Sequence, residues 1–85
     1  MNLRTALARV REHGYLNEFS TPADTWFIAH RVAGGMSDDA VEIPAPLAFR
    51  LIDSGQVVRA GYGHELVNRL GCGSVWYTLN PAEAS

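Results

Sequence analysis

Apolar residues recur at helical spacing near the start of the chain. They lie three and four positions apart, with arginine at several intervening positions: Leu3, Ala6, Leu7 and Val10. This spacing places the apolar side chains on one face of a helix and the charged side chains in solvent. Glycine is typical of the position just after a helix, and Gly14 follows here. We therefore expect a helix over residues 3–12 and a connecting segment over residues 15–21.

The next segment permits two interpretations. Thr21 followed by Pro22 favours the start of a helix, because threonine caps free backbone N–H groups and proline suits the first helical turn. The run Trp26-Phe27-Ile28 suits a buried strand equally well. We expect a helix that ends at Gly34, and a strand is the open alternative for residues 25–33.

Two short helices separated by prolines are expected next. Ser37 and the two aspartates after it predict a helix start, because the hydroxyl accepts a backbone N–H and carboxylates favour the positive end of a helix. Pro44 ends that piece, and Pro46 suits the first turn of a second helix. The second helix has an apolar face and stops at a glycine: Leu47, Ala48, Leu51, Ile52 and Gly55.

The C-terminal part of the chain has strand character. Residues 56–60 contain paired valines, and residues 74–80 alternate between apolar and mixed positions until Pro81 closes the pattern. Residues 61–73 contain four glycines and fit either a further strand or a helical turn. Residues 82–85 are expected to be a frayed tail.

Composition limits the class of protein. The chain has 85 residues, of which 47% are apolar and 19% charged, and this balance predicts one small folded domain over residues 1–85. No apolar run approaches the roughly 20 residues of a membrane-spanning helix, and arginines interrupt the N-terminal region, so we expect a cytoplasmic protein. The formal net charge is −2, which counts against a nucleic-acid partner because the general attraction to phosphate is missing.

The order of elements after residue 36 resembles that of winged-helix transcription regulators. The resemblance rests on the helix pair followed by Gln56-Val57-Val58-Arg59 and then by Trp76-Tyr77-Thr78-Leu79. It implies an α+β, winged-helix-like fold with three to four short helices and a C-terminal antiparallel β-hairpin or three-stranded sheet. It also implies that residues 45–54 form a recognition helix and that residues 61–73 form the wing.

On this resemblance the chain would bind duplex DNA as a transcription regulator and could do so as a homodimer. Arg50 would contact base edges in the major groove, and a second set of residues would contact the phosphate backbone. That second set is Arg59, His64, Asn68 and Arg69.

A protein contact is the alternative function, from a different class. A domain of this kind can bind a protein through the same core pattern without needing a basic surface. The anchors of such a contact would be the aromatic residues Phe49 and Trp76, if both are exposed.

The sequence offers little support for an enzyme. Cys72 and His64 lie eight residues apart, but no third orienting residue or oxyanion-binding group accompanies them. A single cysteine is also too few for an internal disulfide or a zinc finger. His30 predicts a buried core histidine rather than a metal ligand, because no second ligand lies three or four residues away. We expect no cofactor and no metal.

Overall fold

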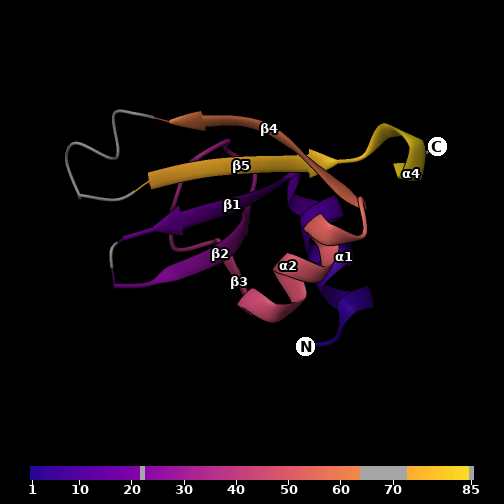
Figure 1. The fold of residues 1–85 in the computed structure, drawn as a ribbon, viewed down its shortest axis with the longest axis horizontal. Helices are drawn as coiled ribbons and strands as arrows, with labels where there is room; N and C mark the ends of the chain where they lie inside the picture. Colours follow the sequence, from indigo (N-terminus) through magenta and orange to yellow (C-terminus); the bar gives the residue numbers. More distant parts are fainter. Residues whose placement is uncertain (22, 64–72, 85) are drawn as a thin grey trace.

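The computed structural model describes residues 1–21, 23–63 and 73–84 (Figure 1). These residues form a small α+β domain with two principal helices, five strands and a short C-terminal helix. In chain order the elements are α1 (Leu3–His13), β1 (Tyr15–Ser20), β2 (Thr25–His30), β3 (Val41–Ile43), α2 (Ala45–Asp53), β4 (Val57–Gly63), β5 (Gly73–Leu79) and α4 (Pro81–Ala84).

Helix α1 confirms the first predicted helix. At its start the side chain of Asn2 accepts a hydrogen bond from the backbone N–H of Thr5 at 2.9 Å, which satisfies one free donor. At its end Gly14 has φ 111° and donates its N–H to the carbonyl of Val10 at 2.7 Å. The positive φ explains why glycine follows the helix.

The five strands form one antiparallel sheet in the order β3-β2-β1-β5-β4. Strand β1 therefore lies at the centre, and the expected connection over residues 15–21 was wrong. This strand was not predicted because Asn17 and Glu18 interrupt the apolar pattern. Both polar side chains have specific partners in the fold. The expected helix over residues 25–33 was also wrong, since residues 25–30 form β2 and the strand alternative holds there.

The size of this sheet contradicts the expected winged-helix-like fold. Five strands and only two principal helices replace the expected three to four helices with a hairpin or a three-stranded sheet. The helix expected at Ser37 does not form. Its hydroxyl contacts the side chains of His30 and Asp39 instead of capping a helix, and the chain reaches β3 through a turn.

The second half of the chain follows its pattern more closely. Helix α2 confirms the helix predicted from Pro46, and Gly55 ends it with φ 76°. Its Ala48 and Leu51 side chains are fully buried. Strands β4 and β5 confirm the two predicted strands, whereas the tail begins with the single turn α4, where Asn80 Oδ1 accepts the N–H of Ala82 at 3.0 Å.

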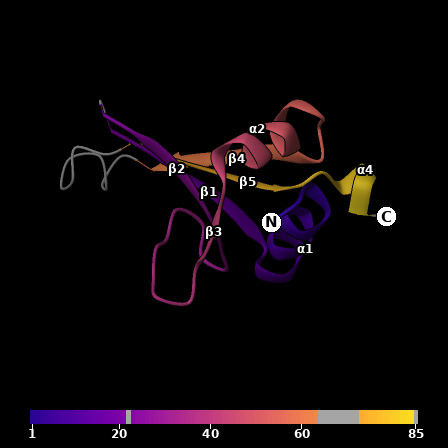
Figure 2. The same ribbon diagram turned by 90° about the horizontal axis from the view of Figure 1, so that it is seen from below.

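The sheet has two differently covered faces. Helices α1 and α2 pack on one face, which we call the helix-bearing face, over the main apolar core: Ala6, Val10, Leu16, Phe27, Ala29, Ile43, Ala48, Leu51 and Val57. The opposite face, which we call the loop-bearing face, carries residues 31–40 between β2 and β3. Figure 2 shows this loop on the side of the sheet away from α2.

The helices cover only part of the helix-bearing face. In Figure 1 α1 and α2 lie over one half of the strands, and the other half extends beyond them. None of the helices within the described residues has the length and apolar composition that a membrane span requires.

Candidate functional site

Two polar regions of this fold are candidates for function, and the first is the loop of residues 31–40. Asn17, fully buried in the central strand, fixes this loop to the sheet. Its Nδ2 donates to the carbonyl oxygens of Val32 and Gly35, each at 2.9 Å, and its Oδ1 accepts the N–H of Gly34 at 3.2 Å. The side-chain amide thus satisfies three backbone groups of the loop.

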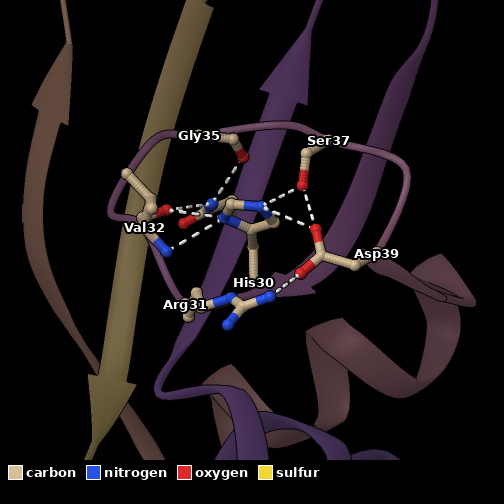
Figure 3. A network of polar contacts seen from close by, with 7 residues as sticks. His30, Arg31, Val32, Gly35, Ser37 and Asp39 are labelled. Atoms are coloured by element: carbon tan, nitrogen blue, oxygen red, sulfur yellow. Dashed lines mark hydrogen bonds and ion pairs between the residues drawn. The ribbon is translucent and has the colours of Figure 1, made fainter.

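A second set of contacts closes the loop at its base (Figure 3). His30 is only 5% exposed, as expected for a core histidine, and its Nε2 lies 2.6 Å from Ser37 Oγ. The Asp39 carboxylate accepts hydrogen bonds from Ser37 and from the guanidinium of Arg31. These two bonds hold the pKa of the Asp39 carboxyl well below its ordinary value.

This network has the residue types of a catalytic triad but the wrong direction of hydrogen bonding. The backbone N–H of Val32 donates to Nδ1 of His30 at 2.9 Å, so neutral His30 carries its proton on Nε2. Nε2 then donates to Ser37, and Ser37 donates to Asp39. A nucleophilic serine needs the opposite, an imidazole nitrogen free to take its proton. The network therefore fixes the loop and does not activate Ser37.

A shallow pocket of about 340 Å³ lies beside this network, lined by Glu12, His13, Arg31 and Asp39. Its charged groups already have partners. Arg9 contacts Glu12 at 3.0 Å, and Arg31 pairs with Asp39. In the described part of the chain no group of three or more potential ligands could hold a metal ion. The pocket therefore presents mainly neutralised charges.

The second region is the uncovered half of the helix-bearing face and its border with the main core. Five side chains from three adjacent strands form what we call the sheet patch: Glu18, Arg59, Tyr62, Val75 and Tyr77. The strand register brings them together, because Val75 pairs with both Glu18 and Tyr62 while Tyr77 pairs with Arg59. Directly paired residues in antiparallel strands point to the same face. The patch continues the row that begins at Phe27, the partner of Glu18 in β2.

A β-bulge in β4 completes the sheet patch. The register shifts between Arg59 and Gly61, so Ala60 is an additional residue relative to β5. Arg59 and Tyr62 consequently share the helix-bearing face, with the Arg59 Cζ 5.4 Å from the centre of the Tyr62 ring. Gly61 faces the other way, where a Cβ atom would lie 2.8 Å from the ring of Trp76.

Glu18 is a half-buried acid in this patch. The Tyr77 hydroxyl donates to Glu18 Oε1 at 3.5 Å, a long hydrogen bond. Burial raises the pKa of the Glu18 carboxyl group, although the Tyr77 hydrogen bond and the charge of Arg59 act in the opposite direction. Burial and the charge of Glu18 raise the pKa of the Tyr77 phenol. No salt bridge to Glu18 forms among the described residues.

Helix α2 forms one border of the sheet patch. Phe49 is 46% exposed, and its ring meets Phe27 edge-on with the ring centres 5.1 Å apart. Arg50 and Asp53 are exposed, on the side of the helix opposite the buried Ala48 and Leu51. An aromatic ring, a cation and an anion are therefore accessible on the outer side of α2.

The structure separates the residues that the sequence suggested as a site. Arg50 and Phe49 lie on α2, and Arg59 lies on β4 within the sheet patch. Trp76 is partly buried and points to the loop-bearing face, where its ring contacts Gly34, so it cannot join Phe49 in one surface. His64, Asn68 and Arg69 lie outside the described residues, as does Cys72.

Sequence reasoning missed Glu18, Tyr62 and Tyr77 as neighbours of Arg59. The alternation of residues 74–80 placed Tyr77 on an apolar face, but only strand order brings that face beside β1. Comparison with protein-family models, curated proteins and solved structures found no match to this chain.

Proposed function

We propose that this chain is a protein-interaction module whose contact surface is the sheet patch together with the outer side of α2. One observation supports this most directly. Exposed Phe49, Tyr62 and Arg59 occupy the same side of the molecule, next to a part of the sheet that none of the described helices covers.

The composition of this surface suits a protein contact. Aromatic residues and arginine contribute most to binding when an interface is formed. Aromatic rings bury large areas with few rotatable bonds, and the planar guanidinium of arginine donates several hydrogen bonds and stacks on rings. Tyr62 is 53% exposed, and half-buried Val75 belongs to neither apolar cluster of the fold. A partner would remove both side chains from water. The charges of Glu18 and Arg59 would set its orientation.

Site-specific photo-crosslinking in the organism that encodes the chain tests this proposal. A photoreactive phenylalanine at position 49 or 62 should give a discrete protein adduct, and Arg59→Glu should reduce its yield. Val32 is the matched control position, because it is 54% exposed but lies in the loop on the opposite face. Absence of adducts at both test positions, or the same adducts from position 32, contradicts the proposal.

Binding of duplex DNA is the second candidate function, retained from the sequence. It is supported by Arg50 and Arg59, two exposed arginines that form no salt bridge within the described residues. The overall negative charge and the carboxylate of Glu18 beside Arg59 weaken it. A fluorescence anisotropy titration with mixed-sequence duplex at low salt separates the two functions. Saturable binding that is lost in the Arg50→Ala, Arg59→Ala double variant would favour DNA.

A further inference from the structure

We propose that the sheet patch binds the outer side of helix α2 from a second copy of this chain, giving a symmetric dimer with both helix layers between two sheets. This inference rests on the proposed function and names the partner. It also goes further, because it states which residues of the two copies meet.

The first step is the incomplete helix layer. A sheet face in a small domain is usually covered by helices, and here α1 and α2 cover one half of it (Figure 1). The uncovered half carries Val75 and Tyr62, whose apolar atoms favour burial, and Tyr77 lies at its border, packed against the main core. In the arrangement we propose, α2 of the second copy fills this half.

The second step is the match in chemistry between the two surfaces. The outer side of α2 carries Phe49, a cation at Arg50 and an anion at Asp53. The sheet patch carries an apolar centre, an anion at Glu18 and a cation at Arg59. Each charge of the helix thus has a counterpart of opposite sign in the patch. The two copies each carry a net charge of −2, so their attraction depends on such local pairs.

The third step is the geometry of the pairing. Arg50 and Asp53 lie one helical turn apart, and Glu18 and Arg59 lie on strands two positions apart, about 10 Å across the sheet. The length of an arginine side chain spans the difference. Arg50 and Asp53 face away from their own sheet, so they point toward the second sheet when the helices lie between the two. Phe49 lies at the flank of α2, where its ring also contacts Phe27 of its own sheet.

Symmetry then makes the contact reciprocal. In a two-fold dimer, the same patch of each copy receives the same helix of the other, and every contact occurs twice. Arg50 of one copy would pair with Glu18 of the other, whose carboxylate accepts only the long hydrogen bond from the Tyr77 side chain among the described residues. Phe49 of the second copy would rest against Val75 and Tyr62.

Sedimentation velocity over about 5 to 500 μM protein tests the dimer. The wild-type chain should shift from monomer to dimer over this range. Glu18→Arg and Arg50→Glu should each raise the dissociation constant by about tenfold or more, because each places like charges together. Asp38→Arg is the control with the same change in net charge as Glu18→Arg, at an exposed position of the loop on the opposite face.

A mixture of the two variants provides the sharpest outcome. One copy then has arginine at positions 18 and 50, and the other has glutamate at both, so every predicted pair is again of opposite sign. The equimolar mixture should recover the wild-type dissociation constant as a heterodimer. An effect confined to the fold of a single chain would not be rescued by mixing.

Circular dichroism tests whether the variants are folded. If Glu18→Arg does not fold, Arg50→Glu still tests the dimer, because Arg50 is an exposed helix residue. A wild-type chain that stays monomeric at the highest concentration, or dimers that neither variant weakens, would overturn the inference. A different result tests the proposed function. A monomer that still forms crosslinked adducts with a different protein through position 49 or 62 keeps the contact surface and rejects self-association.

Discussion

Asn17 in the central strand accepts the backbone N–H of Gly34, 17 positions further along the chain, at 3.2 Å. The same amide donates to two loop carbonyls, so one side chain organises residues 31–40 on the sheet. The contacts of Ser37 with His30 and Asp39 fix the same loop at its base. The first prediction follows from the contacts of Asn17.

Asn17→Ala should lower the free energy of unfolding by about 2–4 kcal/mol, because buried backbone groups lose their partners. Chemical denaturation measures the change. Ser74→Ala is the matched control, since Ser74 is buried but its hydroxyl has no hydrogen-bond partner within the described residues. Ser74→Ala should leave the free energy of unfolding nearly unchanged or raise it slightly. Equal losses in the two variants would contradict the role assigned to Asn17.

Gly34→Ala should destabilise the chain more than Gly55→Ala does. Both glycines have positive φ, 69° and 76°, so alanine is strained at either position by about 1 kcal/mol. At Gly34 the new Cβ would also lie 2.9 Å from the Trp76 ring, whereas at Gly55 no atom lies within 4 Å. Thermal unfolding followed by tryptophan fluorescence compares them. We expect an excess cost of at least about 1 kcal/mol at Gly34.

Asp39→Asn should remove a part of the stability that depends on pH. The folded-state pKa of Asp39 lies below its unfolded value near 3.9, so its carboxylate stabilises the fold above about pH 4. This contribution is lost as the pH falls toward the folded-state pKa. The variant should therefore unfold more easily than wild type at pH 7, and the difference should shrink on acidification below about pH 4. Asp38→Asn, outside the network, should show no such convergence.

Glu18→Gln should change stability at pH 7 in the opposite direction to Asp39→Asn. Burial raises the folded-state pKa of Glu18, so the carboxylate costs stability once the pH rises above the unfolded value near 4.3. The variant should be slightly more stable than wild type at pH 7, by less than about 1 kcal/mol for this half-exposed site, and equal to it near pH 3. Melting curves at protein concentrations too low for dimerisation test this. Glu42→Gln, at an exposed position of β3, is the control.

The sequence predicted the elements that are determined by residues near one another in the chain. Helix α1, helix α2 and the strand β5 have clear periodicity and end at a glycine or a proline. Strand β1 failed because its polar residues are explained only by partners elsewhere in the chain: Asn17 binds the loop, and Glu18 contacts Tyr77.

The candidate site was predicted only in part for the same reason. Arg59 was proposed from the sequence as a DNA phosphate contact and Phe49 as the anchor of a protein contact if exposed, and both lie on the surface that we propose. Their neighbours depend on the strand order β1-β5-β4, which joins residues about 60 positions apart, as in the contact between Glu18 and Tyr77. No local pattern contains that information.

The bulge at Ala60 determines which side of the sheet each later residue of β4 faces. In a regular strand, residues 59 and 62 would point in opposite directions, since three positions is an odd number. The additional residue changes this parity, so a guanidinium and a phenol ring share one face and Gly61 leaves room for Trp76 on the other. If Ala60 instead paired with Trp76 in a regular ladder, the chemistry of the two faces beyond it would be exchanged, whereas deleting this alanine would leave Arg59 and Tyr62 two positions apart and on the same face.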